Sequence, residues 1–153
     1  MELYLIQHGE AKSEHEDSER PLTAKGAENI KKTARFFKQL SKKIDLIWHS
    51  GKKRAEQTAA ILAETLGTGI HMEICAGLAP NDDISIIKKK IETAGQGSIA
   101  LVGHLPHLSR LASKLLTGNR EMGIIRFKNA GIVCLSGEIH DWKLEWIITP
   151  DII

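Results

Sequence analysis

The chain has 153 residues, a length that fits one domain with a substantial buried core, and we expect a single domain over residues 1–153. Its 42% hydrophobic and 26% charged residues are typical of a globular protein and exclude disordered and fibrous classes. The formal net charge of +2 lacks the basic excess of nucleic-acid-binding proteins, and no segment approaches the roughly 18 consecutive apolar residues that span a bilayer. We expect a cytoplasmic protein without nucleic-acid or membrane partners, and we expect it to be a monomer.

Apolar runs alternate with helical patterns along most of the chain. Strands are expected at 3–6, 44–49, 70–74, 98–102, 124–127, 131–136 and 143–148. Apolar residues recur with helical spacing over 27–40, 55–66 and 108–116, and a further helix is expected from 84 to about 93. Thr23 is placed to cap the first helix, Asp83 to cap the third, and Gly67 and Gly118 to end the second and fourth.

The order of these elements predicts an α/β fold. Strands and helices alternate early and strands follow one another late, which indicates a three-layer α/β/α sandwich with a mixed, mostly parallel central sheet. The triplets Gly67-Thr68-Gly69 and Gly95-Gln96-Gly97 complete neither a dinucleotide-binding nor a P-loop pattern, so both are expected to be turns. Cys75 and Cys134 are too few and too far apart for a disulfide framework, and we expect buried, reduced thiols.

Two of the expected strands each end in a histidine, His8 and His104. Ligands of open α/β sheets bind at the carboxyl ends of the strands, so these two side chains are expected to converge. Arg54 lies in the first turn of the second helix, where a guanidinium and a helix N-terminus together suit a phosphate-like anion. A single histidine at a strand end is more often a surface or satisfied polar residue, and the joint placement of the three residues is what favours a functional site.

Four motifs carry a resemblance to a known family. They are His8-Gly9-Glu10-Ala11, Arg20-Pro21-Leu22-Thr23 with Gly26, Ser50 with Arg54-Ala55-Glu56-Gln57-Thr58-Ala59, and Gly103-His104-Leu105-Pro106. In this order and spacing they resemble the histidine phosphatase superfamily, whose fold is phosphoglycerate-mutase-like, over nearly the whole chain. Within that superfamily the short chain most resembles the small bacterial phosphohistidine phosphatases, which act on phosphorylated signalling proteins.

The resemblance implies a metal-independent hydrolase that uses no cofactor. His8 would be the nucleophile and form a covalent phosphohistidine intermediate, which water then hydrolyses, while Arg54 and His104 stabilise the phosphoryl oxygens. Gln7, Gly9 and Leu105 are expected to contact the substrate. The implied substrate is a phosphorylated protein of the histidine phosphotransfer type.

One position departs from the family pattern. The first motif normally reads Arg-His-Gly, and here Gln7 stands in the arginine position, so a charge-assisted contact worth about 1.5–3 kcal/mol is replaced by that of a neutral amide. Two alternatives stay open beside the phosphohistidine phosphatase. One is a phosphatase of small phosphate monoesters, and the other, suggested by Gln7, is a catalytically weak phosphate-binding module.

The proton donor for the leaving group is not identified by the sequence. Many members of the family use a carboxylic acid near the position of Gly77, and its absence implies a leaving group such as a protonated imidazole rather than an alkoxide. Asp82, Asp83 and Glu10 remain candidates for such an acid, although helix capping and solvation account better for all three. His104 with His107 is a poor zinc signature without a third ligand, and His107 is expected at the surface of a helix start.

Overall fold

The computed structural model describes residues 1–67, 69–95 and 97–153. The elements, in chain order, are β1 (Glu2–Gln7), α1 (Ala24–Gln39), β2 (Leu46–His49), α2 (Lys53–Leu66), β3 (His71–Ile74), α3 (Ile84–Ala94), β4 (Ser98–Gly103), α4 (His107–Thr117), β5 (Ile132–Glu138) and β6 (Asp141–Ile148). Thr68 and Gln96, the centres of the two expected turns, lie outside the described residues.

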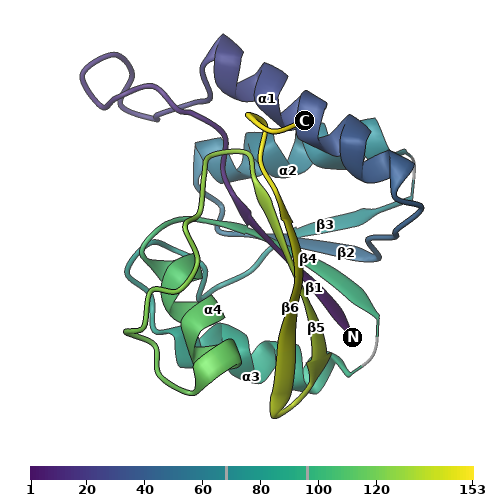
Figure 1. Cartoon of the computed structure of the whole chain (residues 1–153). Helices are drawn as coiled ribbons and strands as arrows, with labels where there is room; N and C mark the ends of the chain where they lie inside the picture. The colour runs from purple at the N-terminus through teal and green to yellow at the C-terminus, as the bar shows by residue number, and fades with distance from the viewer. Residues whose placement is uncertain (68, 96) are drawn as a thin grey trace.

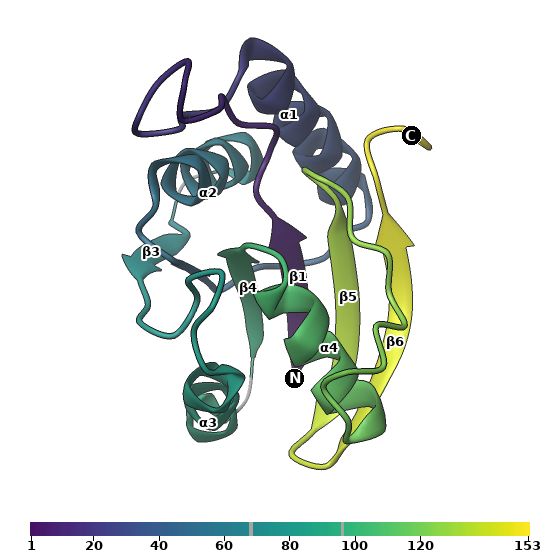
Figure 2. The same ribbon diagram turned by 90° about the vertical axis from the view of Figure 1, so that its left-hand side faces the viewer.

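The strands form one mixed sheet in the described part of the chain, in the order β3-β2-β4-β1-β5-β6. The pairs from β3 to β1 are parallel, and the pairs that join β5 to β1 and β6 to β5 are antiparallel. Helices α1 and α2 cover one face of this sheet and α3 and α4 cover the other (Figures 1 and 2). The expected three-layer α/β/α sandwich is confirmed.

The central strand β1 separates two hydrophobic cores. Leu3 and Leu5 pack into the core on the side of α3 and α4, whereas Tyr4 and Ile6 pack into the core on the side of α1 and α2. All four side chains are almost fully buried, because a strand covered on both faces alternates between two apolar layers. This burial fixes the register of β1, and with it the position of the residues that follow it.

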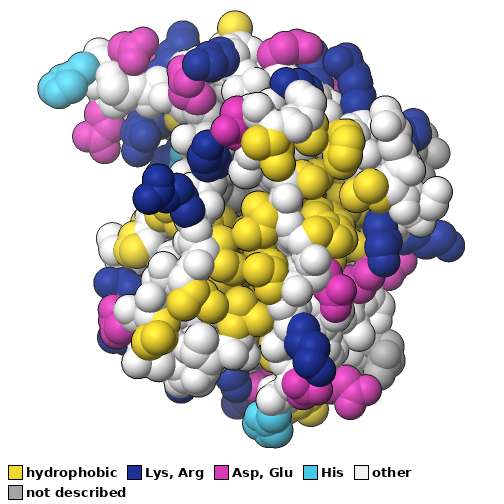
Figure 3. Space-filling view, viewed as in Figure 1, with side chains coloured by type: hydrophobic (Ala, Val, Ile, Leu, Met, Phe, Trp, Pro, Cys, Tyr) yellow, Lys and Arg dark blue, Asp and Glu magenta, His cyan; other side chains and the backbone are white. Residues whose placement is uncertain are grey.

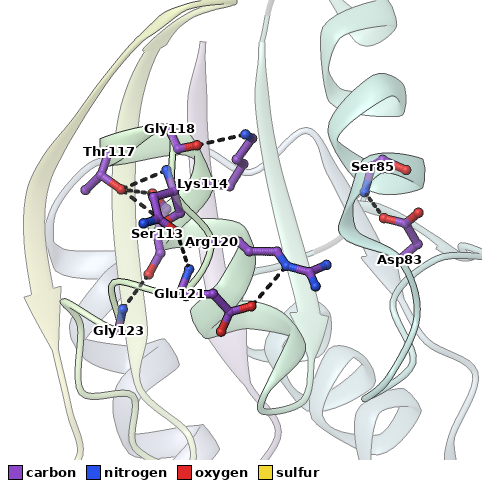
Figure 4. Close-up of polar contacts among 10 residues, drawn as sticks. Asp83, Ser85, Ser113, Lys114, Thr117, Gly118, Arg120, Glu121 and Gly123 are labelled. Atoms are coloured by element: carbon purple, nitrogen blue, oxygen red, sulfur yellow. Dashed lines mark hydrogen bonds and ion pairs between the residues drawn. The ribbon is translucent and has the colours of Figure 1, made fainter.

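The expected helix caps are confirmed. The Thr23 hydroxyl accepts a hydrogen bond from the backbone N–H of Gly26 at 3.0 Å. Asp83 accepts one from the N–H of Ser85 at 2.9 Å, as Figure 4 shows. Gly118 ends α4 in the left-handed region, with a φ of 79° that favours glycine.

The expected strand at 124–127 is wrong. This segment is extended, but it pairs with no other strand among the described residues. Ile125 and Phe127 are buried while Ile124 and Arg126 are exposed, so the period of two reflects packing against the core and not a β-ladder. The late meander therefore has two strands. No described helix is both long and apolar enough to cross a membrane.

Candidate active site

The parallel pairing of β1 and β4 brings the two histidines together. Gln7 lies opposite Gly103 in the register, and the N–H of His8 donates to the carbonyl of Gly103 at 3.1 Å. His104 follows Gly103, so both histidines leave the same edge of the sheet, where the ends of β1 and β4 lie side by side (Figure 2). Their ring centroids are 5.0 Å apart.

His8 is held as a neutral imidazole with one free nitrogen. Its Nδ1 lies 2.6 Å from the carbonyl oxygen of Gly9, and because a carbonyl only accepts, we assign the ring proton to Nδ1. The lone pair of Nε2 is then available to a substrate. Burial is the main cause that lowers the pKa of His8 to about 4. The hydrogen bond to Gly9 raises the pKa and offsets part of this effect, while the charges of Arg54 and Arg20 lower it further.

His104 is more deeply buried, with 1% of its surface exposed. Its Nε2 lies 2.6 Å from the hydroxyl oxygen of Ser50, and its Nδ1 has no hydrogen-bond partner among the described residues. Burial lowers the pKa of His104 to about 3, with smaller contributions from His8 and Arg54. The site therefore keeps both imidazoles neutral at physiological pH.

Arg54 supplies positive charge beside the histidines. It is the second residue of α2, is 9% exposed, and has an Nε with no hydrogen-bond partner within the described chain. Burial lowers its pKa, and repulsion from Arg20 adds to this. The Oε1 of Gln7 is likewise buried and unpartnered. Buried donors and acceptors without partners are rare in folded proteins, so this cluster is suited to a polar ligand.

Arg20 is a site residue that the sequence reasoning missed. Its positive charge lowers the pKa of both His8 and Arg54, so it adds to the positive electrostatics of the site. The Arg20 Nε donates to the carbonyl of Lys12 at 3.1 Å, and the neighbouring N–H of Leu22 donates to a side-chain oxygen of α2 at 2.8 Å. The sequence signal for Arg20 was its place in the second motif, in a chain that has Gln7 where the family has an arginine.

Close backbone packing explains the glycines of the first two motifs. A Cβ on Gly9 would lie 2.9 Å from the carbonyl oxygen of Gly26, and a Cβ on Gly26 would lie 2.1 Å from that of Glu10. The start of α1 therefore presses on the segment after His8. The protein itself uses both polar groups of Gly9, the N–H for Thr58 and the carbonyl for His8.

The other expected site residues lie at the periphery. Leu105 is 39% exposed and directly follows His104. Asp82 accepts a hydrogen bond from the N–H of Ala79 at 3.0 Å, which agrees with a structural role for this carboxylate. Glu10 lies 3.3 Å from the Thr23 hydroxyl and is exposed.

His107 is not at the surface as expected, because its side chain is fully buried. It lies in the first turn of α4, and burial lowers its pKa, an effect that the charge of Asp82 partly offsets. Within the described chain, no three His, Cys, Asp or Glu side chains are grouped to hold a metal ion.

A hollow lies on the face of the molecule at this edge. Figure 3 shows it at the left of the view, below the loop that precedes α1, with Lys and Arg side chains beside it and side chains of both charges on the loop above. The residues after β1 lead into that loop (Figure 1). Positive side chains beside a partly buried site favour an anionic substrate.

Comparisons with known proteins agree with this geometry. The family model of the histidine phosphatase superfamily (branch 1) matches residues 3–79. An uncharacterized protein of Picosynechococcus sp. is 36% identical over 141 residues, which are 88% of this chain and 84% of that one. The phosphohistidine phosphatase SixA of Escherichia coli is 27% identical over 122 residues, 77% of this chain and 76% of that one.

A solved structure has the same fold over nearly the whole chain. The protein histidine phosphatase SixA, complexed with tungstate, superposes with a TM-score of 0.87 at 24% sequence identity. The match covers 99% of this chain and 98% of that one.

Proposed function

The chain belongs to the histidine phosphatase superfamily, and from that premise we propose that it removes the phosphoryl group from phosphohistidine on a signalling protein. Family membership supports a phosphatase activity. The observation that carries the proposal is the His8 imidazole, which donates from Nδ1 to Gly9 and so presents the lone pair of Nε2 next to His104 and Arg54.

The first step transfers the phosphoryl group to His8. The substrate ring enters protonated on the nitrogen that does not carry phosphorus. The Nε2 lone pair of His8 attacks phosphorus in line, the P–N bond of the substrate breaks, and its electron pair returns to the substrate imidazolium, which leaves as a neutral imidazole. His8 then carries the phosphoryl group on Nε2 and the proton on Nδ1, which donates a hydrogen bond to the Gly9 carbonyl. Because the substrate ring leaves neutral, no carboxylic acid is needed to protonate it.

The second step is hydrolysis. Water attacks phosphorus, the bond to Nε2 breaks, and dihydrogen phosphate leaves while His8 returns to its neutral form. We propose that Arg54 and Arg20 neutralise charge on the phosphoryl oxygens in both steps without a metal ion. The depressed pKa of His8 supports this cycle, because the nucleophile is already deprotonated before substrate binds.

The rim of the site supports a protein as the substrate. Ile74 is the last residue of β3 and Leu105 lies two residues after the end of β4; they are 69% and 39% exposed. Exposed apolar side chains around a basic hollow suit contact with a protein surface better than a small metabolite. E. coli SixA, a relative, is itself a phosphohistidine phosphatase.

Phosphate release from three substrates compared side by side tests the proposal. We expect the protein to hydrolyse a phosphohistidine-bearing phosphotransfer protein faster than a sugar phosphate or an aryl phosphate. His8→Ala should abolish all three rates, and His140→Ala, an exposed histidine on the β5–β6 turn, serves as the matched control. A preference for the sugar phosphate would show a small-molecule phosphatase. Phosphate binding without turnover would show a binding module.

A further inference from the structure

The peptide bond between His8 and Gly9 is held at both of its polar atoms by distant side chains. Its N–H, on Gly9, donates to the hydroxyl oxygen of Thr58 at 3.0 Å. Its carbonyl, on His8, accepts from the side-chain amide of Asn129 at 2.9 Å. The two partners come from α2 and from the connection between α4 and β5, so the peptide is fixed from two sides.

Thr58 joins the nucleophile to the helix that carries Arg54. It is fully buried, and its hydroxyl donates to the carbonyl of Arg54 at 2.7 Å while accepting from Gly9. Thr33 and Thr65 make the same bond to the carbonyl four residues earlier, but neither accepts from another segment in the described chain. The Gly9 contact is therefore an added function of the Thr58 hydroxyl.

Asn129 is exposed but held in place by its neighbours. The next residue, Ala130, donates its N–H to the carbonyl of Gln7 at 3.0 Å. Buried Phe127 anchors the same segment in the core, and at the far end the N–H of Gly123 donates to the buried Ser113 hydroxyl at 3.1 Å (Figure 4). The amide of Asn129 is thus presented to His8 by a segment attached at both ends.

We infer that Thr58 and Asn129 are positioning residues that hold the His8–Gly9 peptide so that the Gly9 carbonyl fixes the His8 imidazole. The rotation of this peptide sets the direction of the chain through Gly9, whose carbonyl accepts from Nδ1. If the peptide turns, that bond lengthens, the ring can change tautomer, and Nε2 no longer points at phosphorus. The kinetic part of this inference rests on the proposed function, whereas the tautomer part does not.

Substitutions at Thr58 test the buried half of the arrangement. Thr58→Val keeps the shape and removes the hydroxyl, and we expect kcat to fall about 10- to 100-fold, as for a small displacement of a nucleophile. The KM and the Kd for tungstate should stay within about twofold. Thr58→Ser restores the hydroxyl and should recover most of the rate. Thr33→Val removes the same helical bond from another buried threonine and is the matched control.

Substitutions at Asn129 keep the test valid if Thr58→Val fails to fold. Asn129→Ala removes an exposed side chain, and we expect kcat to fall severalfold without a change in tungstate binding. Asn119→Ala, at the other end of the same connection, is the matched control, because its amide contacts only the local turn.

Nitrogen-15 NMR of the histidine rings separates the two proposals. In the wild type His8 should show the signature of the Nδ1–H tautomer, and Thr58→Val or Asn129→Ala should increase the share of the Nε2–H form. An inactive wild type with these NMR changes would refute the proposed function and retain the inference. Unchanged tautomer signals, or a kcat equal to that of the matched controls, would overturn the inference.

Discussion

The two ends of the central sheet differ in the features that mark a functional site. At the end opposite the histidines, a cavity of about 490 Å³ opens between the start of β1, the end of α3 and the β5–β6 turn, lined by Met1, Ile91 and Trp142 among others. At the carboxyl end of β1 and β4, the buried polar groups without partners are concentrated. Every buried side-chain polar atom without a partner, among the described residues, belongs to Gln7, Arg54, His104 or His107.

This difference favours the carboxyl end of β1 and β4 as the candidate site. Folding leaves few buried donors and acceptors unpaired, because each costs about 1–3 kcal/mol. The unpaired atoms of Gln7, Arg54 and His104 suit a polar ligand at this edge, whereas His107 is buried at the start of α4. Within the described chain, the residues that line the opposite cavity have no buried polar side-chain atom without a partner.

Replacing His8, the proposed nucleophile, should have the largest effect on the rate of phosphate release. It should also distinguish the two ends of the central sheet most clearly. His8→Asn is expected to lower the rate of phosphate release by about four orders of magnitude or more, because the covalent route is lost. Steady-state phosphate release measures this. His140→Asn, on the wall of the opposite cavity, should leave the rate within twofold of wild type. Comparable losses in both variants would contradict the assignment of the site.

The charge of Arg54 should dominate oxyanion binding. Arg54→Ala is expected to weaken binding of tungstate about 10- to 100-fold, since a charge-assisted hydrogen bond contributes about 1.5–3 kcal/mol. Gln7→Ala removes only a neutral amide and should have a smaller effect. Isothermal titration calorimetry measures both constants. Equal losses would show that Gln7 and Arg54 share the anion evenly.

Placing an arginine at position 7 tests the contribution of charge to the same site. Gln7→Arg should supply a further fixed charge beside Arg54 and Arg20 and raise kcat/KM by about one or two powers of ten if the guanidinium finds room. The measurement is the initial rate on the phosphohistidine protein, with Gln7→Lys as a control for charge without the planar fork. A rate that stays at background while phosphate still binds would favour a binding module.

Protonation of the buried histidines should have the smallest of these effects, a change in the free energy of unfolding with pH. The pKa values of His8 and His104 fall to about 4 and about 3 in the folded protein from the ordinary 6.5. Between pH 6.5 and 4 the unfolded chain therefore binds more protons, so the free energy of unfolding should decrease as the pH is lowered through this range. Urea unfolding measures this decrease, which should be smaller in His8→Asn. An equal decrease in both proteins would show that His8 is not buried as described.

Much of this arrangement was predictable from local sequence. The apolar runs before His8 and His104 predict buried strands, and parallel strands deliver their last residues to one edge, so the meeting of the two rings follows from the pattern. The cap residues Thr23 and Asp83 act through contacts within a few positions along the chain, and both predictions are confirmed.

The predictions that were wrong or missing concern residues whose surroundings depend on packing between distant segments. The run at 124–127 alternates like a strand because Ile125 and Phe127 fill the core, and no local signal shows that a partner strand is missing. His107 is fully buried in the first turn of α4, and the order of residues does not reveal this burial. Arg20 reaches the site through a loop whose path the sequence does not fix.

Trapping the covalent intermediate tests the central claim most directly. The protein should be mixed with a phosphohistidine substrate labelled on phosphorus and quenched in base within milliseconds, because phosphohistidine is stable in base and labile in acid. We predict that the label appears on His8, located by mass spectrometry, and that His8→Asn carries none. Phosphate release by the wild type without label on His8, or label that persists in His8→Asn, would contradict the account.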